Sequence, residues 1–490
     1  RKSSWMSGVR VMWKLERKHC LVLLFGLLGL ATNPATAQGS SWQLPQPYSL
    51  MPEDGNLLKT QQQLEQLAAA GRYADAITPA LFLSEALAAD PALGPLALEN
   101  LALVRLRSGD LSGGIDGLQQ VLSRLKQSGN FRDPRLARPL MALGVAYYHA
   151  GDLAQAINHL EQGIFVTRTD KGLEAIEQTV YDDILLDSLI KSGRLEDALN
   201  RLDVSLTIQR QALANGPELE QALARAARWY RNLNAAFQES LLHEERLELV
   251  AARAGEDSPE LVPVYYDLAS SYSRRLHGDL DKLRDMKSAE RNVSYSFVRS
   301  DQIRRAMNYE YGNKQDDRAL LDAEWKAVRA LKLALRILED QSEPDVNAIA
   351  ETYVRLGDHY QLIGDSRKAR RYYQRAYDMF SENGATEYLA QTFGAPVPIY
   401  HKPLKLPPTT DPDVLSAYQG QAELVMDVNS RGQPRNIELL EVRPEQAAVL
   451  EDKALRYSRD TIFRPRITDK GTVGTEKMRY IYHFQPAQEQ

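Results

Sequence analysis

The residue types that could do chemistry are present in this chain, but their spacing assembles no catalytic or metal-binding motif. Seven histidines follow the first 37 residues, at positions 149, 159, 243, 277, 359, 401 and 483. No two of them combine His-x3-His spacing with a nearby carboxylate, the pattern that turns two imidazoles toward zinc. The sequence also lacks a G-x-S-x-G turn, a P-loop and a G-x-G-x-x-G at a strand–helix junction. We therefore expect no catalytic residue, no metal, no cofactor and no enzymatic activity.

Acidic pairs and cysteine do not change this expectation. Asp182-Asp183 and Asp316-Asp317 lie in segments with helical or loop patterns, and we expect them to be solvated. The single cysteine, Cys20, lies within a stretch that has the pattern of a signal peptide. Beyond that stretch the chain can form no disulfide, no cysteine-ligated metal site and no thiol nucleophile.

The N-terminal region has the pattern of a secretory signal. From Met12 onward, three basic residues precede an apolar run from Leu21 to Ala31, and Ala35-Thr36-Ala37 is a small-residue cleavage pattern. That run is 11 residues long, whereas about 20 residues span a bilayer. We therefore expect removal of residues 1–37 and export to the periplasm. An uncleaved anchor in the inner membrane, facing the periplasm, is the alternative.

The charge balance excludes a general nucleic-acid binder. Residues 1–37 carry six of the 60 Lys and Arg and one of the 65 Asp and Glu, so the rest of the chain has a net charge near −10. A protein that binds nucleic acid needs a basic face to displace phosphate counterions. With 43% apolar and 26% charged residues, the composition is that of a soluble globular protein.

A recurring pair of small residues marks helical hairpins between residues 56 and 384. In this region apolar residues recur at i, i+3, i+4 and i+7, which indicates helices. A glycine followed five positions later by a small residue occurs at Gly71/Ala76, Gly109/Gly114, Gly151/Ala156, Gly193/Ala198 and Gly364/Ala369. Each glycine can end one helix in a left-handed conformation, and the small residue allows the next helix to pack closely. Residues 216–340 hide this spacing, and we expect six or seven hairpins in all.

These residues resemble the tetratricopeptide repeat. The best copies are Tyr353, Leu356, Gly357, Tyr360, Gly364, Ala369, Tyr373 and Ala376, and Leu140, Leu143, Gly144, Tyr147, Gly151, Ala156 and Leu160. The first four turns lie 38, 42 and 42 residues apart, against about 34 in the family, so helices or connections should be extended. The resemblance implies a stacked superhelix with a concave groove. Its groove positions fall on Met141, Val145, Tyr148, His149, Val354, Asp358 and Gln361. A solvated helix face is the alternative for each. A second candidate surface combines four arginines and four aromatic residues between Arg291 and Tyr311.

The composition changes after Gly384. Six prolines between Pro396 and Pro412 indicate a semi-rigid linker over residues 385–412. Alternation at Ala422, Leu424, Met426 and Val428 then predicts a strand, and the turn sequence Asn429-Ser430-Arg431-Gly432 predicts a hairpin with residues 435–442. Residues 444–460 have a helical pattern, and alternation from Met478 to Phe484 predicts a last strand.

This order resembles the C-terminal domain of TonB-type energy transducers over residues 413–486. Gly420, Gly432, Phe463-Arg464-Pro465 and Gly471 carry the resemblance, whereas Thr461-Ile462 stands where the family commonly has tryptophan. The resemblance implies β-augmentation, in which the last strand pairs with an extended peptide of an outer-membrane receptor. Here the edge residues would be Arg479, Tyr480, Ile481, Tyr482 and His483. A homodimer through this strand edge, or an edge that merely caps the fold, is the alternative.

The sequence thus predicts a multidomain protein. We expect a signal region over 1–37, a linker over 38–55, an all-α tetratricopeptide-like superhelix over 56–384, a linker over 385–412 and a small α+β (ββαβ) TonB-like domain over 413–490. The function that fits is a periplasmic adaptor for other envelope proteins or peptide segments, linked to TonB-type outer-membrane transport. A membrane-anchored energy transducer and a cell-wall or division scaffold are the alternatives.

Overall fold

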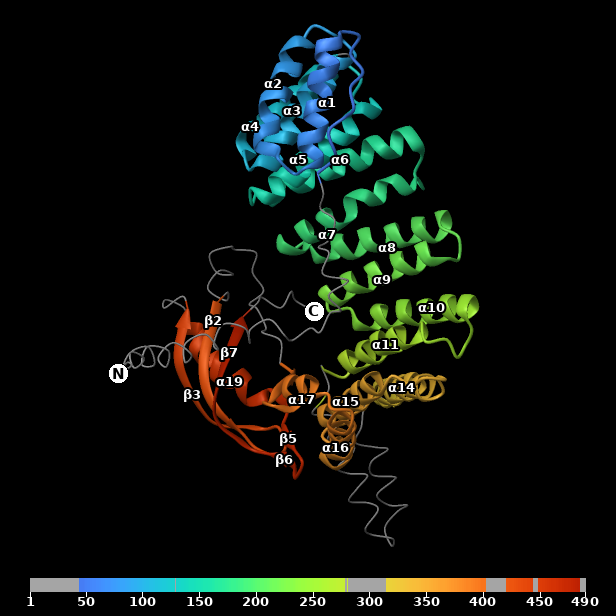
Figure 1. Cartoon of the computed structure of the whole chain (residues 1–490), viewed down its shortest axis with the longest axis vertical. Coiled ribbons are helices and arrows are strands. Elements are labelled where there is room, and N and C mark those ends of the chain that lie inside the picture. The colour runs from blue at the N-terminus through green and yellow to red at the C-terminus, as the bar shows by residue number, and fades with distance from the viewer. Residues whose placement is uncertain are drawn as a thin grey trace, which may run out of the picture.

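The computed structural model describes residues 44–127, 129–277, 280, 314–401, 420–443 and 448–484. Helical hairpins stack along the long axis, and a small sheet lies beside the last of them (Figure 1). Within the described residues seven hairpins pair as follows: α1 (Gly55–Ala69) with α2 (Tyr73–Ala86), α3 (Leu93–Ser108) with α4 (Leu111–Lys126), α5 (Ala137–His149) with α6 (Leu153–Lys171), α7 (Asp182–Lys191) with α8 (Leu195–Ala212), α9 (Pro217–Asn232) with α10 (Ala236–Ala254), α11 (Leu261–Arg275) with α14 (Lys314–Glu339), and α15 (Val346–Leu362) with α16 (Ser366–Glu382). The expected signal peptide and the candidate surface between Arg291 and Tyr311 lie outside the described residues.

The glycine spacing identified five of these hairpins correctly. Each of the five glycines has a positive φ, between 70° and 93°, and lies between the two helices of its hairpin. At three turns the next residue, Asp110, Asp152 or Asp365, caps the following helix by accepting a hydrogen bond from a backbone N–H of its first turn. The four alanines at the small positions are at most 1% exposed. The predicted turn chemistry is therefore confirmed.

The fifth hairpin shows why the spacing is hidden beyond residue 216. Its turn residue is Asn234, which adopts a φ of 55° where the five hairpins named above have glycine. Five positions later stands Glu239, a fully buried carboxylate where those five hairpins have alanine or glycine. Arg231 of α9 and Arg274 of α11 both form ion pairs with it. The buried Glu239 carboxylate of α10, paired with arginines of α9 and α11, thus stands where the small residue would be. The hairpin forms although its sequence lacks the glycine and the small residue.

The long repeat spacing has two sources. Two second helices, α6 and α8, are 19 and 18 residues long. Short 3-10 turns, η1 (Pro134–Leu136) and η2 (Ile176–Tyr181), also precede α5 and α7. The expectation of extended helices or connections is therefore confirmed.

The C-terminal region contains the strands and helix that the sequence predicted, together with short additional strands. An antiparallel sheet has the order β3 (Pro434–Arg443), β2 (Gly420–Val428), β7 (Thr475–Phe484). Helix α19 (Ala448–Asp460) packs on one face of it, where Ala422, Leu424, Met426 and Val428 of β2 are at most 1% exposed. The additional strands are β4 (Ile462–Arg464), β5 (Arg466–Thr468) and β6 (Gly471–Val473).

Two segments predicted as linkers have defined structure instead. Residues 386–393 form helix α17 (Thr386–Phe393), and β1 (Val397–Tyr400) pairs antiparallel with β4. Tyr400 is 9% exposed and Phe393 1% exposed in the core of the last hairpins, so this stretch is held by packing. Before α1, residues 44–54 form neither helix nor strand, and Leu50 is 2% exposed in the core of the first hairpins.

Within the described residues, no helix is both long enough and apolar enough to span a bilayer.

Candidate interaction surfaces

The predicted groove residues of α5 divide into core and surface. Val145 is fully buried in the core shared with α7, so its assignment as a partner contact was wrong. Met141 and Tyr148 are half-buried against the same core, and His149 is exposed. The Tyr148 hydroxyl donates to Asp187 of α7 at 2.5 Å, and the Lys191 ammonium lies 4.7 Å from the centre of its ring. Tyr148 therefore joins consecutive hairpins, and of the four residues His149 is the most accessible.

The predicted groove residues of α15 are occupied by the chain's own C-terminal domain. Val354 is 6% exposed and belongs to the core. Gln361 donates its side-chain N–H groups to the carbonyl oxygens of Arg431 at 2.5 Å and Phe463 at 3.1 Å. Asp358 accepts from Arg464. Asp358 and Gln361 therefore contact the chain's own C-terminal region, whereas Val354 lies in the core.

The contact between Asp358 and Arg464 is a half-buried, two-point ion pair. Arg464 Nε and Nη2 lie 2.9 and 2.7 Å from the two carboxylate oxygens, and Arg464 Nη1 donates to the Thr392 carbonyl at 3.0 Å. Tyr373 donates to the same carboxylate at 2.8 Å. Burial by itself would lower the pKa of the Arg464 guanidinium, but the Asp358 carboxylate outweighs burial and raises it. Arg464 therefore stays charged and holds β4 on the last hairpin.

The predicted strand edge exists, but its side chains divide between two faces. Among the described residues β7 pairs only with β2, so its other edge has no partner strand. Arg479, Ile481 and His483 are exposed on the face away from α19, whereas Tyr482 is 6% exposed in the core. Tyr480 also packs toward the core. The two tyrosines can therefore offer a partner only their backbone.

His401, which follows β1, supports the buried side of β7. Its Nε2 lies 3.0 Å from the Tyr480 hydroxyl, and its ring stacks on the Tyr480 ring. Burial lowers the pKa of His401 to about 4, so its ring is neutral at pH 7 and can accept a hydrogen bond from the Tyr480 hydroxyl. This contact fixes the inner face of a strand whose outer edge pairs with no other described strand.

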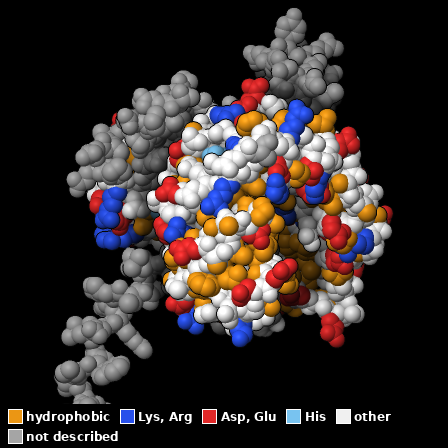
Figure 2. Space-filling model, turned by 90° about the horizontal axis from the view of Figure 1, so that it is seen from above, with side chains coloured by type: hydrophobic (Ala, Val, Ile, Leu, Met, Phe, Trp, Pro, Cys, Tyr) orange, Lys and Arg blue, Asp and Glu red, His pale blue; other side chains and the backbone are white. Residues whose placement is uncertain are grey.

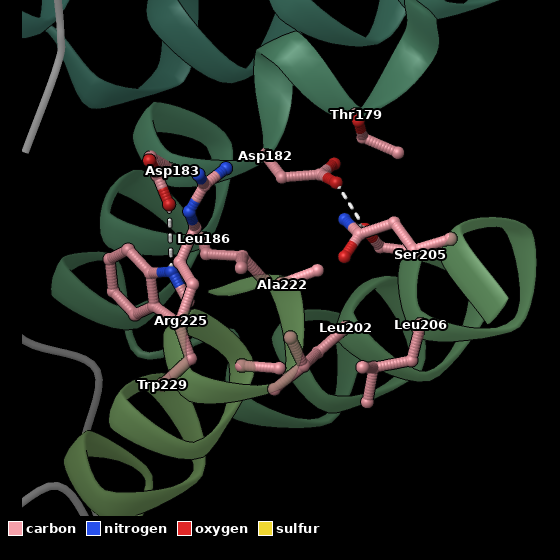
Figure 3. A pocket seen from close by; sticks show the side chains of 12 residues that line it. Thr179, Asp182, Asp183, Leu186, Leu202, Ser205, Leu206, Ala222, Arg225 and Trp229 are labelled. Carbon is pink, nitrogen blue, oxygen red and sulfur yellow. Dashed lines mark hydrogen bonds between the residues drawn. The ribbon is translucent and has the colours of Figure 1, made fainter. Parts of the chain in front are cut away.

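A small pocket between the fourth and fifth hairpins was missed by the sequence analysis. It is lined by residues of η2, α7, α8 and α9 (Figure 3). Asp182, expected to be solvated, is 6% exposed, and it accepts hydrogen bonds from Arg201 Nε at 2.6 Å and the Ser205 hydroxyl at 2.5 Å. Burial raises the pKa of Asp182 to about 6 although Arg201 opposes this. Asp183 accepts from the Trp229 indole at 2.9 Å. The side chains of Asp316 and Asp317 lie outside the described part.

These contacts tie consecutive helices together rather than forming a reactive centre. Asp182, Arg201 and Ser205 link α7 to α8, and Asp183 and Trp229 link α7 to α9. Each of the two carboxylates already accepts from a donor of the protein itself. In the described part of the chain, no three His, Cys, Asp or Glu side chains are placed to hold a metal ion.

At one end of the array, apolar side chains of the described residues are exposed. Figure 2 looks down on the end formed by the first hairpins, where hydrophobic side chains gather between charged ones. Leu81 and Phe82 of α2 are 38% and 51% exposed. Repeats of this kind bury their faces only against neighbours, and the described residues place no hairpin beyond the first.

Comparison with known proteins identifies the repeats. Residues 326–382 match the family model described as tetratricopeptide repeat. The match spans the second half of α14 together with α15 and α16. No curated protein matches the chain.

Solved structures with similar helical arrangements share little sequence with this chain. A kinesin light chain with nearly identical tetratricopeptide-like repeats from Podosopora anserina is 17% identical, covers 42% of this chain and 99% of its own, with a TM-score of 0.37. A tetratricopeptide repeat protein from Parabacteroides merdae is 13% identical, with coverage of 69% and 99% and a TM-score of 0.32. A Rap protein in complex with competence and sporulation factor is 15% identical, with coverage of 68% and 89% and a TM-score of 0.31.

Together, the family match and the stacked hairpins make the larger part of this protein a tetratricopeptide-like array. Such a fold serves protein–protein interaction. The C-terminal unit is a small strand-containing region joined to the array by Asp358, Gln361 and Arg464.

Proposed function

We propose that this protein is an exported adaptor without catalytic activity, which binds an extended peptide segment of an envelope protein at the outer edge of β7. The observation that carries the proposal is the accessibility of that edge. Among the described residues β7 has a strand on one side only, and Ile481, 43% exposed, lies between the exposed Arg479 and His483. An unpaired strand presents a row of backbone donors and acceptors that an added strand can satisfy.

The chemistry of the edge favours a peptide with an apolar residue beside an acidic one. The exposed Ile481 side chain offers an apolar contact to the added strand. The Arg479 side chain is 69% exposed and contacts Glu423 of β2 at 3.3 Å. Main-chain hydrogen bonds would supply affinity, and these side chains would supply selectivity. An outer-membrane receptor of the TonB-dependent type is the partner that the C-terminal sequence resemblance favours.

Photo-crosslinking from single positions tests this proposal. A photoreactive amino acid at position 481 should crosslink to an outer-membrane protein in intact cells of a Gram-negative host. Leu440 on the opposite edge strand β3 is the matched control, because it is 49% exposed on the same sheet. Crosslinks from 481 to a second copy of this chain would replace the proposal with a homodimer. Equal crosslinking from both positions, or none from 481, would contradict it.

The intact mass of the protein isolated from its native envelope tests whether the chain is exported with removal of residues 1–37. A mass that corresponds to a start at Gln38 supports a cleaved, periplasmic adaptor. A mass that retains the residues from Met12 onward supports a membrane-anchored energy transducer instead. Binding to purified cell wall would favour the third function, a cell-wall or division scaffold.

A further inference from the structure

An extended stretch of the chain, residues 44–50, lies along the inner face of the first three hairpins. It has neither helical nor strand structure, and it runs beside α1 (Figure 1). Its polar contacts come from α1, α3 and α5, which are the first helices of their hairpins. The stretch thus occupies the face that a tetratricopeptide-type array leaves concave.

The centre of this stretch is held through its backbone. The Asn100 carboxamide accepts from the Tyr48 N–H at 2.5 Å and donates to the Tyr48 carbonyl at 2.9 Å. Gln61 donates to the same carbonyl at 3.0 Å. The two bonds of Asn100 satisfy both backbone groups of one residue, as a neighbouring strand would do. Side chains of the array therefore replace a sheet partner.

Two arginines hold the preceding residues in the same way. Arg107 donates to the carbonyls of Pro45 at 3.0 Å and Leu44 at 2.6 Å. Arg138 donates to the Gln46 carbonyl. The carbonyls of residues 44, 45, 46 and 48 are thus all bound by side chains. These contacts recognise an extended main chain whatever its side chains are.

The side chains of the stretch supply selectivity. Leu50 is 2% exposed among apolar residues of the first two hairpins, and the Arg138 guanidinium lies 3.5 Å from the centre of the Tyr48 ring. Leu44 packs against two cores, one shared by the second and third hairpins and one shared by the third to fifth. Prolines at 45 and 47 favour an extended backbone for themselves and for the residues before them. The groove therefore fits an extended segment of the type Leu-Pro-x-Pro-Tyr-x-Leu.

The array places buried polar side chains where its helices would otherwise have apolar ones. Gln61, Glu99 and Asn100 are 1%, 2% and 1% exposed. Glu99 pairs with Arg138 at 2.8 Å and thereby orients it. A buried carboxamide without a partner is destabilising, and the Asn100 carboxamide makes its two hydrogen bonds to the Tyr48 backbone. These side chains are suited to an extended peptide and disfavour an empty groove.

We propose that the inner face of α1, α3 and α5 is a binding site for an extended, proline-containing peptide, and that residues 44–50 are its intramolecular occupant. A partner segment of the same chemistry binds there by displacing them. Four residues separate Leu50 from the start of α1, so the tethered stretch competes at an effective concentration in about the millimolar range. The inference goes beyond the proposed function, because it adds a second peptide site that does not depend on β7.

Peptide binding to the full chain tests the site. The probe is a fluorescein-labelled synthetic peptide with the sequence of residues 43–51, titrated by fluorescence anisotropy. A chain with Tyr48→Ala, whose own segment is weakened, should bind the probe at least about tenfold more tightly than the unmodified chain. A peptide of scrambled order should bind neither chain.

Two asparagine substitutions in the helices, one in the site and one outside it, test the helical side of the contact. Added to Tyr48→Ala, Asn100→Ala should reduce probe binding at least about tenfold, because it removes both hydrogen bonds to the central backbone. Asn200→Ala on α8 replaces an exposed asparagine and should change nothing. Probe binding that does not depend on Asn100 would overturn the proposal.

Hydrogen exchange of the unmodified chain needs no variant. The Tyr48 amide should be protected, and excess unlabelled peptide should accelerate its exchange as the segment is displaced. Unchanged exchange together with no probe binding to either chain would overturn the proposal. That outcome would leave crosslinking from position 481 unaffected, so failure of the groove and failure of the β7 edge are distinguishable.

Discussion

The guanidinium of Arg464 and the carboxylate of Asp358 form a two-point ion pair across 106 positions of the chain. The pair joins β4 to α15, beside the Gln361 contacts to the backbone of the C-terminal region. At the other end of the array, residues 44–50 lie on α1, α3 and α5. The protein thus covers the inner face of both its first and its last hairpins with its own segments.

Loss of the Arg464 side chain should loosen the C-terminal region from the array. We expect Arg464→Ala to destabilise the chain by about 3 kcal/mol, because it leaves a half-buried carboxylate without its counter-ion. The measurement is the midpoint of urea unfolding. Arg443→Ala is the control, since Arg443 and its partner Glu441 are 64% and 42% exposed and exposed pairs contribute little. Equal shifts for both variants would contradict a structural role for the half-buried pair.

Gly432 should tolerate no side chain. Its φ is +74°, and a Cβ there would lie 1.9 Å from the Phe463 carbonyl oxygen and 2.5 Å from Gln361 Nε2. We expect Gly432→Ala to cost about 3 kcal/mol, from backbone strain together with displacement of β4. In Gly474→Ala the new Cβ would make only ordinary van der Waals contacts, the nearest at 3.5 Å, and the unfolding midpoint should be nearly unchanged. A comparable loss in both variants would show that the close approach at Gly432 is unimportant.

Glu239 should make stability depend on pH in the acid range. Burial opposes its charge, but His243, Arg274 and Arg231 outweigh burial and lower its pKa to about 2 from an ordinary value of 4.5. A pKa that is lower in the folded chain contributes stability that is complete above pH 4.5 and is lost as the pH falls toward 2. The contribution is at most about 3 kcal/mol.

Thermal midpoints at pH 7 and pH 3 should therefore differ less in Glu239→Gln than in the unmodified chain. The substitution should also lower the midpoint at pH 7, because it leaves Arg231 and Arg274 without their shared carboxylate. Glu260→Gln removes a more exposed ion pair, with Arg253 at 2.7 Å, and should keep the original pH dependence. If the thermal midpoint of Glu239→Gln fell between pH 7 and pH 3 as much as that of the unmodified chain, Glu239 would not be the source of the acid sensitivity.

The turn between α7 and α8 requires a left-handed residue. Gly193 has a φ of 76°, and alanine in that region costs about 1 kcal/mol. We expect Gly193→Ala to lower the thermal midpoint and Asn234→Gly, at the corresponding turn of the fifth hairpin, to leave it equal or higher. Gly55→Ala, at the start of α1 where a Cβ meets nothing within 4 Å, is the control. A midpoint unaffected by Gly193→Ala would contradict the turn assignment.

The amino-acid sequence by itself determined the local features of this fold. Gly109 and Asp110 end one helix and cap the next through contacts between residues that are neighbours in the chain. The alternation from Ala422 to Val428 identified the central strand, because successive side chains of a strand point to opposite faces. Such patterns can be recognised without knowing what packs against them.

Tertiary structure alone decided what those elements meet. Glu239 replaces a small residue and Asp182 is buried because arginines from other helices reach them, and no local pattern announces such pairs. Likewise, Tyr48 binds Asn100 across 52 positions and Arg464 binds Asp358 across 106. These contacts depend on which hairpins the stacking brings together, so only the folded chain shows that stretches predicted as linkers are held in place and that both ends of the groove are covered.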